Sequence, residues 1–275
     1  MLKELIVVAL PIGNAEDMSF RVKKALQVVD GVLAEDTRKF RDFCRWAGLD
    51  LSCEIQSFDS NKERDADYQK LFEKLNGRWA LVTDAGTPAV NDPGSWIVKS
   101  ARHHKIKVTA LPGASALTLA LQMTGGFGNP TSFLGFTPKK VKKDFFEEHC
   151  ASKTLIFFES KHNVLSTLEA LSESHLKDAK IICLREMTKE HEEYIQGNVA
   201  ELKAFFEEKL KSEQVGELTF VVEGLGKAST SSQVEASDLV EFRKASPSQA
   251  AKLLAKLSGL SRDEAYELLS SGKSD

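Results

Sequence analysis

Short segments of continuous apolar residues alternate with amphipathic segments along most of the chain. Seven of the apolar segments are expected to be strands: residues 5–10, 31–34, 79–83, 107–111, 154–158, 181–184 and 218–222. Most of them lack the apolar–polar alternation of a strand with one solvated face, which is typical of strands buried on both faces. Between them, segments such as 164–171 repeat apolar residues at helical spacing. The pattern predicts an α/β protein with at least one mostly parallel sheet.

Two stretches interrupt this pattern. Residues 125–130 are rich in Gly and end in Pro, and they are expected to form a loop between two α/β halves. Residues 224–237 are rich in Gly, Ser and Thr, have no apolar period and are expected to be exposed. We predict an N-terminal α/β domain over 1–113, a C-terminal α/β domain over 114–224, a linker over 225–237 and a helical appendage over 238–275. The appendage is too short to bury a core alone, so it is expected to pack on the body or on a partner.

One helix start in the first half carries a clear local signal. Asp92 is followed by Pro93, and this pair predicts a helix with Asp92 as its N-cap and Pro93 as its first residue.

The composition is that of an ordinary globular protein. Of the 275 residues, 42% are hydrophobic and 28% are charged, which excludes a disordered or low-complexity chain. The 37 Lys and Arg residues face 40 Asp and Glu residues, so any binding of nucleic acid needs local basic patches. The longest apolar run, residues 5–12, is far shorter than the ~18 residues that span a membrane, and the first residues lack signal-peptide features. The four cysteines are widely separated and are expected to be reduced, buried thiols in a cytoplasmic protein.

Three predicted strands of the first half end in similar turns. Residues 11–14, 84–88 and 112–116 each combine Pro and Gly directly after a strand. Ligands of open parallel sheets bind at the carboxyl ends of the strands, so three such turns together indicate one small-molecule site. The common signatures for ATP hydrolysis, dinucleotide binding and serine hydrolysis are absent, and the histidines lack the spacing of metal ligands, so no metal site is predicted.

Two groups of charged residues are candidates for chemistry. Residues 35–38, Glu-Asp-Thr-Arg, follow the second predicted strand, and the helix after them places Arg38, Arg41 and Arg45 on roughly one face. Residues 139–143 contain four lysines. Both groups suit a phosphate backbone, and both are equally compatible with a solvated surface carrying ion pairs.

Polar residues also follow two strands of the second half. Residues 159–162 and 185–189 are expected to form a matching rim of the same cleft. Salt bridges at a domain interface are the alternative for Arg185 and Glu186.

Eight motifs, in order, resemble the RsmI family. They are Pro-Ile-Gly-Asn at 11–14, Glu-Asp-Thr-Arg at 35–38, Thr-Asp-Ala-Gly-Thr-Pro at 83–88, Asp-Pro-Gly at 92–94, Pro-Gly-Ala-Ser-Ala at 112–116, Gly-Phe-x-Pro at 135–138, Glu-Ser-x-His at 159–162 and Arg-Glu-x-Thr-Lys at 185–189. The resemblance implies an S-adenosylmethionine-dependent methyltransferase of the tetrapyrrole-methylase superfamily (class III), acting on a cytidine ribose 2′-hydroxyl in the decoding region of small-subunit ribosomal RNA. It also implies two α/β domains with the cofactor between them, in a homodimer.

The resemblance also implies roles for single residues. The cofactor would contact eight of them: Leu10, Pro11, Gly13, Asp84, Gly86, Thr87, Ser115 and Ala116. The family's motif names no general base; from the chemistry of the reaction, Glu35 or Asp36 is the candidate that accepts the hydroxyl proton, with Arg38 steering an RNA phosphate. The rival interpretation is that these carboxylates only hold Arg38 and the following helix.

The chain departs from the family pattern at Lys161, Asn163 and Gln196, where the family has Pro, Arg and Arg. These differences concern the target nucleotide more than the cofactor. Two alternatives stay open at this point: a related methyltransferase acting on a tetrapyrrole or another small molecule, and a catalytically silent RNA-binding assembly factor.

Overall fold

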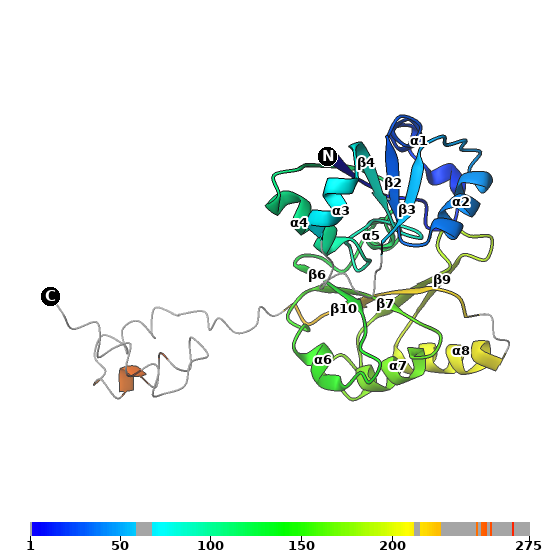
Figure 1. Cartoon of the computed structure of the whole chain (residues 1–275). Coiled ribbons are helices and arrows are strands. Elements are labelled where there is room, and N and C mark those ends of the chain that lie inside the picture. Colours follow the sequence, from blue (N-terminus) through cyan, green and yellow to red (C-terminus); the bar gives the residue numbers. More distant parts are fainter. Residues whose placement is uncertain are drawn as a thin grey trace.

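The computed structural model describes residues 2–58, 68–211 and 215–226, together with residues 246, 249–251, 254 and 266. The chain forms two lobes, each built on one five-stranded sheet, with the first lobe at the top of Figure 1. The predicted α/β class is confirmed. None of the described helices has the length and hydrophobicity that crossing a membrane requires.

The first lobe is a doubly wound sheet. Its five strands are all parallel, in the order β3-β2-β4-β1-β5. The strands are β1 (Leu2–Val8), β2 (Gly31–Ala34), β3 (Glu54–Ser57), β4 (Gly77–Val82) and β5 (Lys107–Leu111). The helices are η1 (Ala15–Asp17), α1 (Phe20–Leu26), α2 (Thr37–Trp46), α3 (Tyr68–Lys74) and α4 (Ser95–His103).

Helices cover both faces of this sheet. Successive residues of a strand point to opposite faces, so Val32 and Ala34 pack with α1 and α2, while Leu33 packs with α3 and α4. All four residues of β2 are buried. The uninterrupted apolar runs in the sequence follow from this two-sided burial.

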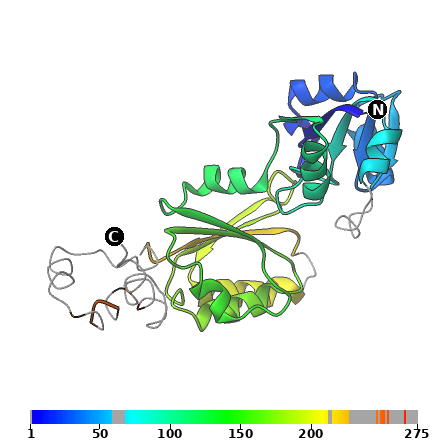
Figure 2. The same ribbon diagram turned by 60° about the vertical axis from the view of Figure 1, so that its left-hand side comes forward.

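The second lobe has a mixed sheet in the order β6-β7-β10-β8-β9, in which only β6 and β7 pair in parallel. The strands are β6 (Thr131–Phe136), β7 (Thr154–Glu159), β8 (Ile181–Arg185), β9 (Glu193–Gly197) and β10 (Leu218–Glu223). The helices are α5 (Ala116–Thr124), α6 (Lys143–Glu147), α7 (Val164–Ser172) and α8 (Val199–Lys211). As Figure 2 shows, α5 lies over one face and the other helices cover the opposite face.

All seven predicted strands are present, and the described part of the chain contains three more. The additional strands β3, β6 and β9 each lie at the edge of a sheet. Their residues are largely half-buried or exposed, in contrast to the fully buried β2 and β8. An edge strand has a neighbour on one side only, so its sequence does not need the apolar run on which the prediction depended. The fourth edge strand, β5, was predicted from its sequence.

Two local predictions are wrong. Asp92 does not cap a helix, because α4 begins at Ser95 with Gly94 as its N-cap. Residues 125–130 do form a loop, but they do not connect the two halves, because Ala120 of α5 already packs with Ile156 and Val221 of the second sheet. The predicted linker and appendage lie outside the described residues, apart from residues 225 and 226 and the single residues named above.

Candidate active site

The three Gly- and Pro-containing turns meet at the carboxyl edge of the first sheet. Leu10 N donates to Gly86 O at 2.8 Å, and Gly86 N donates to Leu10 O at 3.1 Å, which joins the turns after β1 and β4. Thr87 Oγ1 donates to the carbonyl of Ala114 at 2.9 Å, which joins the turns after β4 and β5. The turns therefore form one continuous rim, as predicted.

A pocket of about 180 Å³ lies between this rim and the second lobe. The first lobe and α5 line it with Ile12, Ala85, Gly86, Thr87, Val90, Asp92, Ser115 and Ala116. The second lobe adds Phe136, Phe158, Glu159, Met187, Glu217, Leu218 and Thr219. Because β10 runs antiparallel to β7 and β8, its first residues lie beside the last residues of those strands, which completes the wall.

Four of the predicted cofactor residues line the pocket, namely Gly86, Thr87, Ser115 and Ala116. Leu10 and Pro11 are buried behind the rim, and Leu10 packs in the core of the first lobe. Gly13 lies against the second lobe, where a Cβ atom would come within 2.6 Å of Lys189 Cγ.

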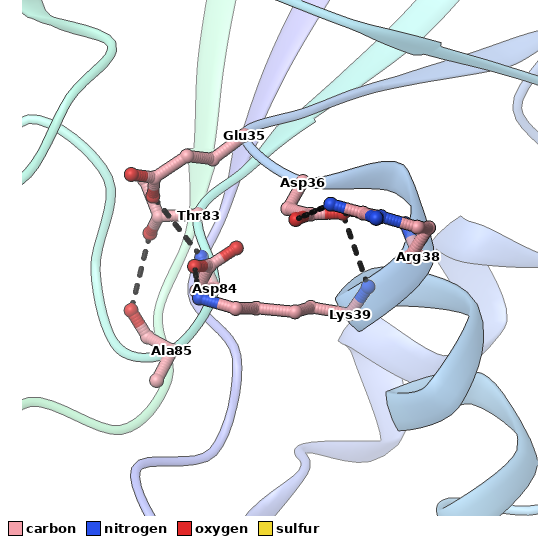
Figure 3. A network of polar contacts seen from close by, with 7 residues as sticks. All are labelled: Glu35, Asp36, Arg38, Lys39, Thr83, Asp84 and Ala85. Carbon is pink, nitrogen blue, oxygen red and sulfur yellow. Dashed lines mark hydrogen bonds and ion pairs between the residues drawn. The ribbon is translucent and has the colours of Figure 1, made fainter.

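Figure 3 shows a polar network at the ends of β2 and β4. Lys39 Nζ donates to Asp84 Oδ2 at 2.6 Å, and the backbone amide of Asp84 donates to Glu35 Oε2 at 3.4 Å. The other oxygen of Asp84, Oδ1, is buried and has no hydrogen-bond partner within the described ranges. Burial, followed by the charge of Asp84, raises the pKa of Glu35 above its usual value.

Asp36 is the N-cap of α2. Its Oδ1 accepts from the backbone amides of Arg38 at 2.8 Å and Lys39 at 3.4 Å, and its Oδ2 lies 3.3 Å from the guanidinium of Arg38. These bonds, above all the one from the Arg38 amide, lower the pKa of Asp36. Capping satisfies amides that a helix leaves free at its first turn. None of the three predicted catalytic residues lines the pocket, and their role in catalysis stays a prediction.

Besides Glu217, Asp92 is an acidic residue of the pocket that the sequence analysis did not assign to the site. It lies in the pocket wall, in the segment between the 84–88 turn and α4. Burial, followed by the charges of Glu35, Asp84 and Glu217, raises the pKa of Asp92 to about 6. Its position shortly after the Gly86 turn was a signal, but the following Pro93 favoured the capping interpretation.

The second lobe supplies only part of the expected rim. Glu159 lines the pocket and accepts hydrogen bonds from the amide of Ser160 at 2.7 Å and from the hydroxyls of Thr137 and Thr167. Arg185 is buried, and its Nε donates to Glu193 Oε2 at 2.6 Å. Arg185 therefore makes a structural ion pair, but with the neighbouring strand of its own sheet and not at a domain interface, where the alternative had placed it.

The basic residues differ in whether acidic side chains form ion pairs with them. On α2, Arg38 pairs with Asp36, and Arg45 pairs with Asp42. The four lysines of residues 139–143 are exposed, and the described part of the chain shows no ion pair for them. This lysine segment follows Phe136, whose side chain is 56% exposed at the pocket.

Neither a metal site nor a disulfide is formed by the residues that the structure describes. Within those ranges, no group of three His, Cys, Asp or Glu side chains is placed to hold a metal ion. The four cysteines are free; Cys44 and Cys183 are buried as expected, whereas Cys53 and Cys150 are half-buried.

Comparison with known proteins places this site in a family. Residues 4–203 match the family described as tetrapyrrole (corrin/porphyrin) methylases. Relatives named ribosomal RNA small subunit methyltransferase I cover most of the chain. The protein of this name from Streptococcus pyogenes serotype M3 is 35% identical, and the match covers 96% of this chain and 93% of the relative. The one from Thermotoga maritima is 36% identical and covers 80% of this chain and 98% of its own.

Solved structures agree on the fold. Diphthine synthase superimposes with a TM-score of 0.59 at 15% identity, covering 80% of this chain and 89% of its own. Uroporphyrin-III C-methyltransferase from Thermus thermophilus, complexed with S-adenyl homocysteine, gives 0.54 at 14% identity and covers 80% and 97%. The chain therefore belongs to the ribosomal RNA small subunit methyltransferase I family of the tetrapyrrole methylases, and it is an S-adenosylmethionine-dependent methyltransferase.

Proposed function

We propose that this methyltransferase methylates the ribose 2′-hydroxyl of a cytidine in the decoding region of small-subunit ribosomal RNA. The observation that carries the proposal is the 35% identity, along 96% of the chain, to relatives named for small-subunit ribosomal RNA. The order of the eight motifs supports the finer statement about the nucleotide. The structural neighbours named for tetrapyrroles are only 13–16% identical, so they support the fold and not a small-molecule substrate.

The surface around the pocket suits RNA. Phe136 offers an exposed aromatic ring at the pocket, and unpaired bases of RNA stack on such rings. The exposed lysines of residues 139–143 follow it directly, and lysines bind phosphates through their charge. We propose that the ring contacts a base and that the lysines contact the RNA backbone.

The residues of the pocket fit S-adenosylmethionine. Asp84 does not line the pocket itself but directly precedes Ala85, which does; its buried Oδ1 lacks a hydrogen-bond donor from the described residues, so it can accept one from a ligand. Ser115, the N-cap of α5, makes no side-chain capping bond, which leaves the amides of the first helical turn for a carboxylate. Ile12, Val90 and Met187 supply the apolar surface that an adenine ring needs. We propose that these groups hold the cofactor.

In this reaction the protein must align the ribose hydroxyl with the methyl group and remove one proton from the hydroxyl. The cofactor supplies a methyl group already activated on a cationic sulfonium. Carboxylates of the pocket wall give that region a negative potential, which suits a cationic ligand. Holding the ribose hydroxyl in line for attack on the methyl group accelerates the reaction further.

Ribose-methylation mapping tests the proposal. Small ribosomal subunits lacking the modification are incubated with the protein and S-adenosylmethionine, and ribose 2′-O-methylation is read from resistance to alkaline cleavage. We expect one new modified cytidine in the decoding region. The Gly86→Trp variant serves as the inactive control, because Gly86 lines the pocket and an indole at this position would occupy the pocket. Methylation of a base, or of no RNA at all, would contradict the proposal.

A further inference from the structure

Asp92 differs from the other carboxylates of the pocket wall in having no hydrogen-bond donor. Glu159 is bound by Thr137, Thr167 and the amide of Ser160. Glu217 accepts from Lys189 Nζ at 3.0 Å. For Asp92, the described residues provide no donor, and its Oδ2 would lie 3.8 Å from a Cβ atom on Gly86. The free carboxylate of Asp92 thus lies beside the Gly86 turn, in the pocket that the cofactor would occupy.

The charges around Asp92 are negative from both lobes. Glu35 at the end of β2 and Asp84 at the end of β4 approach it from the first lobe, and Glu217 before β10 approaches it from the second. The nearby cations are engaged elsewhere: Lys39 pairs with Asp84, and Lys189 pairs with Glu186 and Glu217. An acid in this setting holds a proton more tightly than an ordinary aspartate does.

We propose that Asp92 is the general base that accepts the proton of the attacking ribose hydroxyl. The inference builds on the proposed function. In this step the ribose oxygen forms a bond to the methyl carbon, and the carbon–sulfur bond breaks with its electron pair passing to sulfur. The hydroxyl proton passes to the Asp92 carboxylate and then to solvent.

Asp92 suits this role better than the two candidates found from the sequence. Glu35 accepts the backbone amide of Asp84, and Asp36 accepts two amides of α2. Neither lines the pocket, whereas Asp92 does. A base with a pKa near 6 is also ionised at neutral pH and still a stronger proton acceptor than an ordinary carboxylate.

The first test needs no cofactor. Asp92 has an ordinary pKa of 3.8 in the unfolded chain and one of about 6 in the folded protein. Because the folded state binds this proton more tightly, the stability that the protonated acid contributes is full below pH ~4 and is lost as the pH rises through ~6. Relative to wild type, Asp92→Asn should therefore gain melting temperature as the pH rises from about 4 to about 8. Asp50→Asn, at an exposed position, is the matched control and should show no such gain.

The second test is the pH dependence of single-turnover methylation on small ribosomal subunits. The wild-type rate should rise with pH and level off above ~6, and Asp92→Asn should lose this plateau and be slower by about 10²–10⁴-fold. Asp92→Glu keeps a carboxylate and should keep a plateau at reduced rate.

The outcomes separate the two levels of the proposal. A wild-type protein that methylates no ribosomal RNA overturns both the function and the inference. If the wild-type protein is active and the Asp92→Asn variant has the same pH profile as wild type, only the inference is overturned. A variant that loses affinity for S-adenosylmethionine but not for S-adenosylhomocysteine, with the plateau retained, assigns Asp92 to binding the sulfonium charge and also overturns the role as base.

Discussion

At the scale of single residues, similar carboxylates near the pocket have different environments. Asp36 is bound by two backbone amides and Arg38, which favour its ionised form, whereas Asp92 is surrounded by carboxylates and lacks a donor within the described ranges. Both acids belong to short motifs that follow a strand or turn of the first lobe, Glu-Asp-Thr-Arg at 35–38 and Asp-Pro-Gly at 92–94. Their partners, and not their residue type, decide which one is available for proton transfer.

Gly86 gives the first prediction at this scale. It has φ +70°, which L side chains adopt only with strain, and it forms part of the pocket wall. Replacing it by Trp should weaken binding of S-adenosylmethionine by roughly 10–100-fold, because overpacking of this kind costs about 1–3 kcal/mol. Titration calorimetry measures the change. Gly125→Trp is the matched control: it has the same φ of +70° but nothing within 4 Å of its Cβ position, so affinity should be retained.

Asp36 gives the second prediction. If it caps α2, Asp36→Ala should lower the melting temperature, and Asp36→Asn should not, because Asn is an equally good N-cap. A catalytic base would be lost in both variants, so the single-turnover rate of Asp36→Asn distinguishes the two roles. A rate reduced about 10²-fold or more in a fully stable Asp36→Asn variant would assign it to catalysis.

At the scale of elements, the basic residues belong to two segments that differ in how many of their charges are paired with acidic side chains. The arginines of α2 include two that pair with acids of the same segment, as in the alternative of a solvated face. The lysines of residues 139–143 lie between β6 and α6 and are exposed. We expect the lysine segment to contribute more to RNA affinity than α2.

Charge reversal tests this expectation. Changing the four lysines of 139–143 to Glu should weaken binding to RNA of any sequence and flatten its salt dependence, by roughly 0.7–0.9 in the log–log slope for each phosphate that the protein no longer neutralises. Reversal of Arg38, Arg41 and Arg45 should have a smaller effect. Filter binding at several salt concentrations measures both. Reversal of Lys177 and Lys180, which are exposed elsewhere in the second lobe, is the control. An unchanged slope in both basic variants would place the RNA on another surface.

At the scale of the whole molecule, the pocket depends on how closely the lobes approach each other. Gly13 marks one contact between them, because a Cβ atom there would lie 2.6 Å from both Lys189 Cγ and Thr188 Oγ1 and 3.2 Å from the backbone oxygen of Met187. Gly13 therefore has a role in lobe packing, while the contact to the cofactor expected from the sequence stays a prediction. The homodimer and the domain boundaries also stay predictions.

Replacing Gly13 by Val should act as a wedge between the lobes. We expect a larger radius of gyration in solution scattering and weaker binding of S-adenosylmethionine, since Met187 and Glu217 would move away from the Gly86 turn. Gly13→Ala should show a smaller effect in the same direction. Wild-type scattering together with wild-type affinity in the Val variant would show that this contact does not hold the pocket closed.

The sequence by itself determined the central strands, the three turns and the family. Central strands are buried on both faces and therefore need apolar residues throughout. Tight turns need Gly and Pro, so both features can be recognised from the residue types of a short segment. The motifs that identify the family are likewise short and contiguous, and the relatives at 35–37% identity confirm it.

Only the tertiary structure decided which side chains share the pocket. Asp92 and Glu217 are far apart in the chain and come together because the two sheets meet at their strand ends. Edge strands such as β3 and β9 likewise owe their structure to a neighbouring strand more than to their own apolar content. Contacts of this kind depend on how distant segments pack, and a local pattern such as Asp-Pro at 92–93 carries no information about that packing.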